Sequence, residues 1–159
     1  MRLRRAAAVA VGLTTLGSTT PASAQESPKQ DAVERSVVKK LNAMRAQHGL
    51  RRLRSSRALN RAADSKSVEI VTTGSFSHGA LGPRVRRFVR AKAVGETLAW
   101  VPPSQGSDAA AVVGAWMRSP SHRATLLSPR FARVGIGRRS GSLGGGPAVV
   151  FTVDLASAR

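Results

Sequence analysis

The chain has 159 residues, a formal net charge of +18 and no cysteine. The absence of cysteine excludes cysteine proteases, thiolate metal sites and thiol redox motifs. With 26 basic and only eight acidic residues, the surface should attract anionic polymers and lipid headgroups, and salt should weaken that attraction.

The first 24 residues have the three parts of a secretory signal peptide. Three arginines form a basic start, an apolar run extends from Ala6 to Leu16, and Ala22-Ser23-Ala24 provides a small-residue cleavage pattern. The apolar run is too short to span a bilayer, and no later stretch approaches that length. A signal anchor that stays attached is the alternative to cleavage.

The expected organisation is a signal peptide over 1–24, a flexible lead-in over 25–31 and a single domain over 32–159. The signal segment carries three of the 26 basic residues and none of the eight acidic ones, so the mature chain has a net charge of +15. A chain of this size can bury a core without disulfides. We expect it to be secreted or to lie at the cell envelope, without a transmembrane segment after cleavage.

Helical periodicity dominates the first half of the expected domain. Apolar residues recur at steps of three and four and predict a helix that begins after Asp31 and ends near Gly49. These apolar residues are Val33, Val37, Leu41 and Met44. A second helix is expected from about Ser56 to Gly74. Its predicted buried residues are Leu59, Ala62, Ala63, Val68 and Ile70.

The second half combines a helix with two strands. Ser107 or Asp108 is expected to cap a helix that Pro120 ends. Strand-like runs at 133–137 and 148–155 flank a glycine-rich turn. Helices followed by an antiparallel hairpin predict an α+β layered domain. The two tryptophans, Phe131 and Phe151 are expected to lie in the core or along an apolar cleft.

Few polar groups are candidates for chemistry. His78 follows Phe76-Ser77, His122 follows Pro120-Ser121, and Glu96 lies between them in an apolar stretch. A buried carboxylate needs a partner, and two histidines with one carboxylate are a minimal set for a divalent metal or for a base oriented by an acid. The alternative is a hydrogen-bonded cluster that holds loops to the sheet.

Other polar residues are interpreted more simply. Ser119 and Ser121 lie near His122, but no nucleophile-elbow sequence accompanies them, so we interpret them as turn residues. His48 is expected at the end of the first helix. Asp154 should point to the opposite face from Val153 in the last strand, where it could pair with an arginine, and nothing in its surroundings indicates catalysis.

A basic segment precedes Glu96 and surrounds a short helical turn expected at 85–89. Runs of this kind are usually solvated, and their excess over acidic residues makes an electrostatic role plausible. The residues assigned to this basic surface are Arg84, Arg86, Arg87 and Arg90.

Five motifs occur in a fixed order along residues 36–155. They lie at 41–50, 76–78, 95–99, 115–127 and 131–137, with a closing segment at 151–154. Together they resemble the bacterial branch of the CAP superfamily, named for cysteine-rich secretory proteins, antigen 5 and pathogenesis-related proteins. The resemblance implies a three-layer α-β-α sandwich with a central antiparallel sheet.

The resemblance also implies a cleft lined by two histidines and two acids. By motif, the histidines are His78 and His122, and Glu96 is one acid. Thr97 stands where the motif has Asn, and Ser119 stands where the second acid is expected. Three of the four cleft positions are therefore present. Such a cleft can hold zinc or another divalent metal, with Glu96 bonded to a bound water or to a histidine N–H.

Together with the export signal, the resemblance implies a secreted binding module for a lipid, a sterol or another envelope ligand. The family has no established common catalytic activity, so the balance is against an enzyme. One alternative is a secreted hydrolase acting on peptides or cell-wall polymers. In it, Glu96 would be the base or would orient a water, and the two histidines would be metal ligands or the acid. The other is an electrostatic binder of anionic polymers or membranes.

Overall fold

The computed structural model describes residues 31–158. The expected signal peptide, and all of the lead-in except Asp31, lie outside the described residues. The elements in chain order are α1 (Ala32–Gln47), β1 (Arg54–Ser55), α2 (Arg57–Thr73), α3 (Leu81–Arg86), β2 (Val94–Val101), η1 (Pro103–Gln105), α4 (Ala109–Arg118), α5 (Pro120–Leu126), β3 (Arg133–Leu143) and β4 (Gly146–Ala156).

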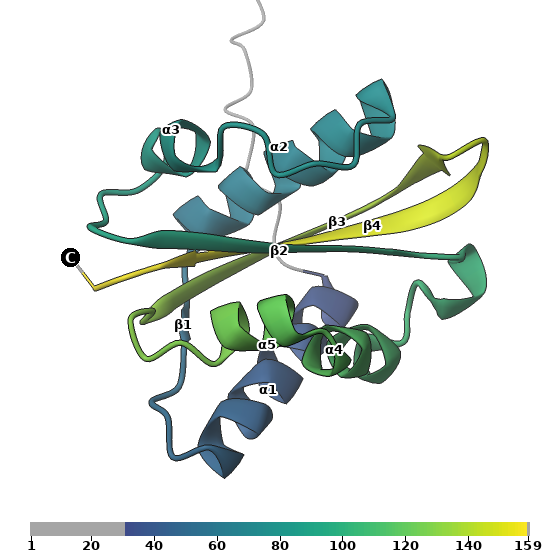
Figure 1. The fold of residues 1–159 in the computed structure, drawn as a ribbon. Coiled ribbons are helices and arrows are strands. Elements are labelled where there is room, and N and C mark those ends of the chain that lie inside the picture. The colour runs from purple at the N-terminus through teal and green to yellow at the C-terminus, as the bar shows by residue number, and fades with distance from the viewer. Residues whose placement is uncertain (1–30, 159) are drawn as a thin grey trace, which may run out of the picture.

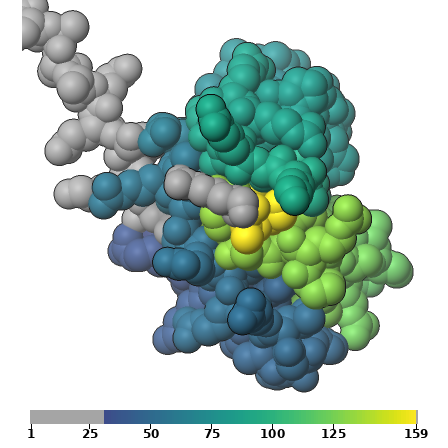
Figure 2. All heavy atoms as spheres, turned by 90° about the vertical axis from the view of Figure 1, so that its left-hand side faces the viewer, coloured from purple at the N-terminus to yellow at the C-terminus, as the bar shows by residue number. Residues whose placement is uncertain are grey.

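A four-stranded sheet forms the middle layer, with strand order β1-β3-β4-β2. β4 pairs antiparallel with both β2 and β3, and the two residues of β1 pair parallel with β3. Helices α2 and α3 cover one face, and α1, α4 and α5 cover the other (Figure 1). Figure 2 shows the same layers from the side, with the teal residues around α3 above the strand ends. The expected α+β sandwich is confirmed, and the parallel β1 is an addition.

The central strand β4 alternates between the two layers of helices. Its odd-numbered residues Val149, Phe151, Val153 and Leu155 belong to the larger core, which α1 and α4 complete. Its even-numbered residues face α2 and α3. Because a strand points successive side chains to opposite faces, β4 presents Thr152 and Asp154 to the same side. Glu96 and Arg84, the partners of Asp154 described below, also lie on this side.

Helix α2 lies very close to β3 because two glycines face it. A Cβ atom on Gly135 would lie 2.1 Å from the Leu59 backbone, and one on Gly137 would lie 2.3 Å from the Asp64 backbone nitrogen. The Ser67 hydroxyl donates to the Gly137 carbonyl (3.0 Å) and is bonded to the Thr152 hydroxyl (2.9 Å). This close approach fixes α2 over the even-numbered residues of β4.

Most predicted helix ends are confirmed. Asp31 and Glu34 form a reciprocal capping box at the start of α1, and Ser56 and Asp108 cap α2 and α4. Gly74, in the left-handed conformation with φ +71°, ends α2. Pro120 both separates α4 from the next helix and begins that helix, α5.

Some expectations about burial and extent are wrong. Val68 is 41% exposed, although the sequence predicts it to be buried. Trp100 is 52% exposed, although it is expected in the core or along an apolar cleft. Trp100 lies near the end of β2, which is an edge strand and has fewer neighbours to bury it. The hairpin strands are longer than predicted, so that only Gly144 and Gly145 connect them. The short helix before β2 begins at Leu81, earlier than the expected turn at 85–89.

Candidate functional site

Two buried carboxylates lie opposite each other on adjacent strands. Glu96 of β2 and Asp154 of β4 are direct partners in the sheet register. Both side chains are completely buried. Like charges at directly opposed positions destabilise a sheet and make each carboxyl harder to ionise, unless a cation compensates them.

Arg84 of α3 provides that cation. Its guanidinium donates to both carboxylate oxygens of Asp154 at 2.8 Å, and Nη2 also donates to Oε2 of Glu96. Nη1 donates further to the Ala62 carbonyl at 2.7 Å. Because Arg84 is only 6% exposed, its assignment to the basic surface is wrong. Helix α3 packs toward β2 and directs this side chain inward, whereas Arg86, Arg87 and Arg90 are exposed as predicted.

The second carboxylate oxygen of Glu96 accepts a hydrogen bond from a histidine. His78 lies in the segment between α2 and α3, and its Nδ1–H donates to Oε1 of Glu96 at 2.7 Å. The His78 side chain is 54% exposed, in contrast to its fully buried partner. With Nδ1 engaged, Nε2 is the ring nitrogen that remains to meet a ligand.

Burial and mutual charge shift the pKa values of this group. Burial raises the pKa of Glu96, the charge of Asp154 adds to the rise, and His78 and Arg84 oppose it. Burial also raises the pKa of Asp154, against the hydrogen bonds and charge of Arg84. The pKa of Arg84 lies above its ordinary value, because Asp154 and Glu96 outweigh the effect of burial. The carboxyl groups of Glu96 and Asp154 therefore titrate as a coupled pair beside the permanent charge of Arg84.

A second buried cation supports the segment that carries His78. Lys66 of α2 is 1% exposed, and its Nζ donates to Oε1 of Glu69 at 2.8 Å. A Cβ atom on Gly79 would lie 3.6 Å from this nitrogen, which places the ammonium group beside the residue that follows His78. Sequence reasoning missed Lys66. The signal was its place four residues after Ala62 and four before Ile70, both predicted to be buried.

A cleft of about 410 Å³ opens beside His78. It lies at β2, between residues on the α3 side and residues on the α5 side of the sheet. Its walls combine apolar and polar side chains: His78, Leu81, Gly95, Thr125, Arg130 and Phe131. The Phe131 ring packs onto Gly95 so closely that a Cβ there would lie 2.6 Å from it. The cleft therefore suits a small ligand with both polar and apolar parts.

Arg45 of α1 fixes the far wall of this cleft. It is 1% exposed and forms no ion pair within residues 31–158, yet it donates to the carbonyls of Leu126 (2.7 Å), Ser128 (3.0 Å) and Phe131 (3.4 Å). Burial lowers its pKa. Backbone carbonyls thus solvate the buried guanidinium in place of a carboxylate, and the same hydrogen bonds hold the segment after α5 in position.

Within residues 31–158, the hydrogen bonds of the Glu96 side chain go to His78 and Arg84 and not to His122 or Ser119. Burial lowers the pKa of His122 on α5, and the positive charge of His78 lowers it further, so the two imidazoles are near enough to interact. No hydrogen bond within residues 31–158 joins them, and His122 does not line the cleft beside His78. The Ser119 hydroxyl lies 3.3 Å from that of Ser121 and supplies no acid.

Within residues 31–158, His78, Glu96 and His122 do not come together as three ligands of one metal ion. Both Glu96 oxygens are engaged by Arg84 and His78. The described part of the chain holds no cluster of three or more His, Asp or Glu side chains able to bind a metal ion. The contact of His78 with Glu96 is the arrangement found behind many metal-ligating histidines, so Glu96 would orient a ligand rather than be one. A metal contact through two imidazoles stays a prediction.

Comparison with known proteins gives consistent matches. A sequence profile of the cysteine-rich secretory protein (CAP) family matches residues 38–155. The protein YkwD of Bacillus subtilis (strain 168) is 32% identical over 119 residues, which cover 70% of this chain and 45% of YkwD. A solved extracellular protein of Bacillus anthracis with an SCP domain superposes with a TM-score of 0.65 at 25% identity, over 79% of this chain and 40% of that one.

An outer surface protein of Borrelia burgdorferi has the same fold, with a TM-score of 0.64 at 19% identity over 84% of this chain and all of that one. The chain spans less than half the length of the two Bacillus relatives.

Replacing Arg84 should destabilise the fold strongly. Arg84→Met leaves Glu96 and Asp154 buried without their cation, so we expect the free energy of unfolding to fall by about 3–5 kcal/mol in a urea titration. The matched control is Arg87→Met on the same segment, where the side chain is exposed and the change should stay within about 0.5 kcal/mol.

Neutralising Glu96 and Asp154 in the Arg84→Met protein tests whether unpaired buried charge causes the loss of stability. Arg84→Met combined with Glu96→Gln and Asp154→Asn should recover at least half of the lost stability, because no buried charge then lacks a partner. A triple variant no more stable than Arg84→Met alone would contradict the proposed charge balance.

The proximity of the imidazoles is testable by NMR titration of His122. We expect its midpoint below the ordinary value of about 6.5. His78→Ala should raise it, because a neighbouring positive charge is removed, whereas His48→Ala at the end of α1 should not move it. An unchanged midpoint in His78→Ala would show that the two rings are not neighbours.

Proposed function

Because the chain belongs to the cysteine-rich secretory protein (CAP) family, we propose that it is an extracellular binding module whose ligand site is the cleft beside His78. The location is supported by relatives that are an extracellular protein and an outer surface protein, and by the signal peptide expected at 1–24. No helix within residues 31–158 has both the length and the apolar character needed to cross a membrane.

The proposal rests on one observation, which is that both carboxylate oxygens of Glu96 already accept hydrogen bonds. A general base must reach a water or a substrate proton, but one Glu96 oxygen accepts from Arg84 and the other from His78. This carboxylate therefore orients an imidazole. The hydroxyl groups of Ser119 and Ser121 bond to each other, and the described residues show no hydrogen bond from either to a histidine. This geometry favours binding over hydrolysis.

The orientation of the His78 imidazole indicates which chemical group the ligand should present to it. With its proton on Nδ1, His78 offers the Nε2 lone pair to a donor such as a hydroxyl group. Leu81 and Phe131 provide apolar surface in the same cleft. A volume of about 410 Å³ is within the usual range for small-molecule sites. We therefore expect a compact, largely apolar molecule with one hydroxyl, such as a sterol or a related lipid.

A fluorescent sterol and its O-methyl ether test this proposal, because the ether cannot donate to Nε2. The protein should bind the free sterol about tenfold more tightly than the ether, which corresponds to one hydrogen bond. His78→Ala should remove this preference, and His48→Ala should keep it. Equal affinity of the unaltered protein for the two probes would reject the cleft as a hydroxyl-reading site.

A further inference from the structure

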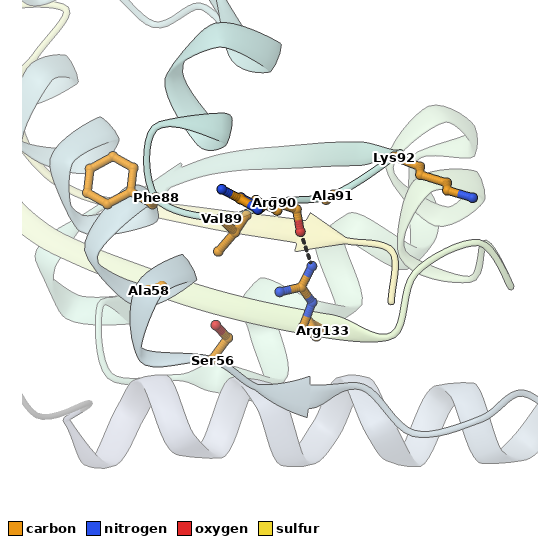
Figure 3. Close-up of a pocket in the computed structure, with 8 residues that line it drawn as sticks. All are labelled: Ser56, Ala58, Phe88, Val89, Arg90, Ala91, Lys92 and Arg133. Atoms are coloured by element: carbon orange, nitrogen blue, oxygen red, sulfur yellow. Dashed lines mark hydrogen bonds between the residues drawn. The ribbon is translucent and has the colours of Figure 1, made fainter. Parts of the chain in front are cut away.

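A second cavity, of about 740 Å³, lies between the start of α2, the segment 88–92 and the start of β3 (Figure 3). Three of its lining side chains are cationic, and apolar side chains form much of the rest. We call it the arginine pocket and define it by Arg90, Lys92 and Arg133 with Ala58, Phe88 and Val89. None of its lining residues belongs to the cleft beside His78.

No carboxylate of residues 31–158 lines the arginine pocket. Seven of the eight acidic residues lie within residues 31–158, and all seven are engaged elsewhere. Asp31 pairs with Arg138, Asp64 with Arg139, Glu69 with Lys66, Glu96 and Asp154 with Arg84, while Glu34 accepts from backbone N–H groups and Asp108 caps α4. Within residues 31–158, none of these acids forms an ion pair with Arg90 or Lys92.

Backbone contacts hold the pocket in shape. Arg133 donates from Nε (3.0 Å) and Nη2 (2.8 Å) to the Ser157 carbonyl, and Nη2 also donates to the Arg90 carbonyl at 2.8 Å (dashed in Figure 3). These bonds tie β3 to the segment 88–92. The Arg90 side chain is exposed, and within residues 31–158 no carboxylate pairs with it. Arg133 therefore fixes the wall of the pocket, and the exposed guanidinium of Arg90 is suited to bind an anion there.

We propose that the arginine pocket binds a phosphate ester that carries a small apolar group. Guanidinium groups match the oxygens of phosphate in bidentate geometry, and a phosphomonoester supplies up to two negative charges. A carboxylate supplies one charge and two acceptor atoms, so it satisfies fewer of these donors. The cavity exceeds the size of a bare ion, and Ala58, Phe88 and Val89 provide contact for the attached group.

Phenyl phosphate and inorganic phosphate are the probes for calorimetry on the purified protein. Phenyl phosphate should bind more tightly than inorganic phosphate, because only the ester uses the apolar wall. Arg90→Ala should weaken phenyl phosphate binding about tenfold or more, as expected for a hydrogen bond to a charged group. The matched control is Arg87→Ala, which removes the same charge from an exposed residue outside the pocket and should weaken binding less than about threefold.

Equal losses in Arg90→Ala and Arg87→Ala would overturn the proposal, because they would show attraction to overall charge only. Absence of phenyl phosphate binding would overturn it as well. His78→Ala should bind phenyl phosphate normally, which keeps this test separate from the proposed function.

Vesicles identify the source of the phosphate. Co-sedimentation with phosphatidylglycerol vesicles, but not with phosphatidylcholine vesicles, that is lost in Arg90→Ala and kept in Arg87→Ala would assign a lipid headgroup. Equal vesicle binding by both variants, with phenyl phosphate binding still dependent on Arg90, would assign a soluble ester.

Discussion

The cross-strand pairing of Glu96 with Asp154 is the constraint on which the site depends. Two carboxylates in direct register inside the protein need a cation that reaches both, and the planar guanidinium of Arg84 donates to each of them. A lysine has a single charged nitrogen and cannot reproduce this bidentate contact. The requirement draws α3 onto the sheet beside β2. The segment before α3, which carries His78, is thereby held next to Glu96.

Buried and exposed arginines have separate roles in this chain. Arg84 and Arg45 are almost completely buried, the first balanced by carboxylates and the second by backbone carbonyls, and they fix opposite walls of the His78 cleft. Burying a charged guanidinium costs free energy, and two such groups beside one cleft are consistent with a site that needs a rigid geometry. Arg90 is exposed and has no acidic partner within residues 31–158. The large positive charge therefore combines structural cations with cations available to anions.

The sequence predicted the parts of the fold that depend on local signals. Periodicity and capping residues such as Asp31, Ser56 and Asp108 located the helices, and the motifs indicated the sandwich. It did not predict β1, which has two residues and forms only by pairing with β3. Arg84 was misassigned because nothing near it in sequence distinguishes an inward from an outward arginine. The decisive fact, the register of β2 on β4, arises from residues nearly sixty positions apart.

The central claim is that Glu96, held by Arg84, fixes the imidazole of His78 with its proton on Nδ1. Long-range ¹H–¹⁵N NMR of the neutral imidazole reads this tautomer directly. The account predicts that His78 is protonated on Nδ1 in the unaltered protein and shifts toward the other tautomer in Glu96→Gln. A His78 ring protonated on Nε2 in the unaltered protein, or the same tautomer distribution in both proteins, would contradict it.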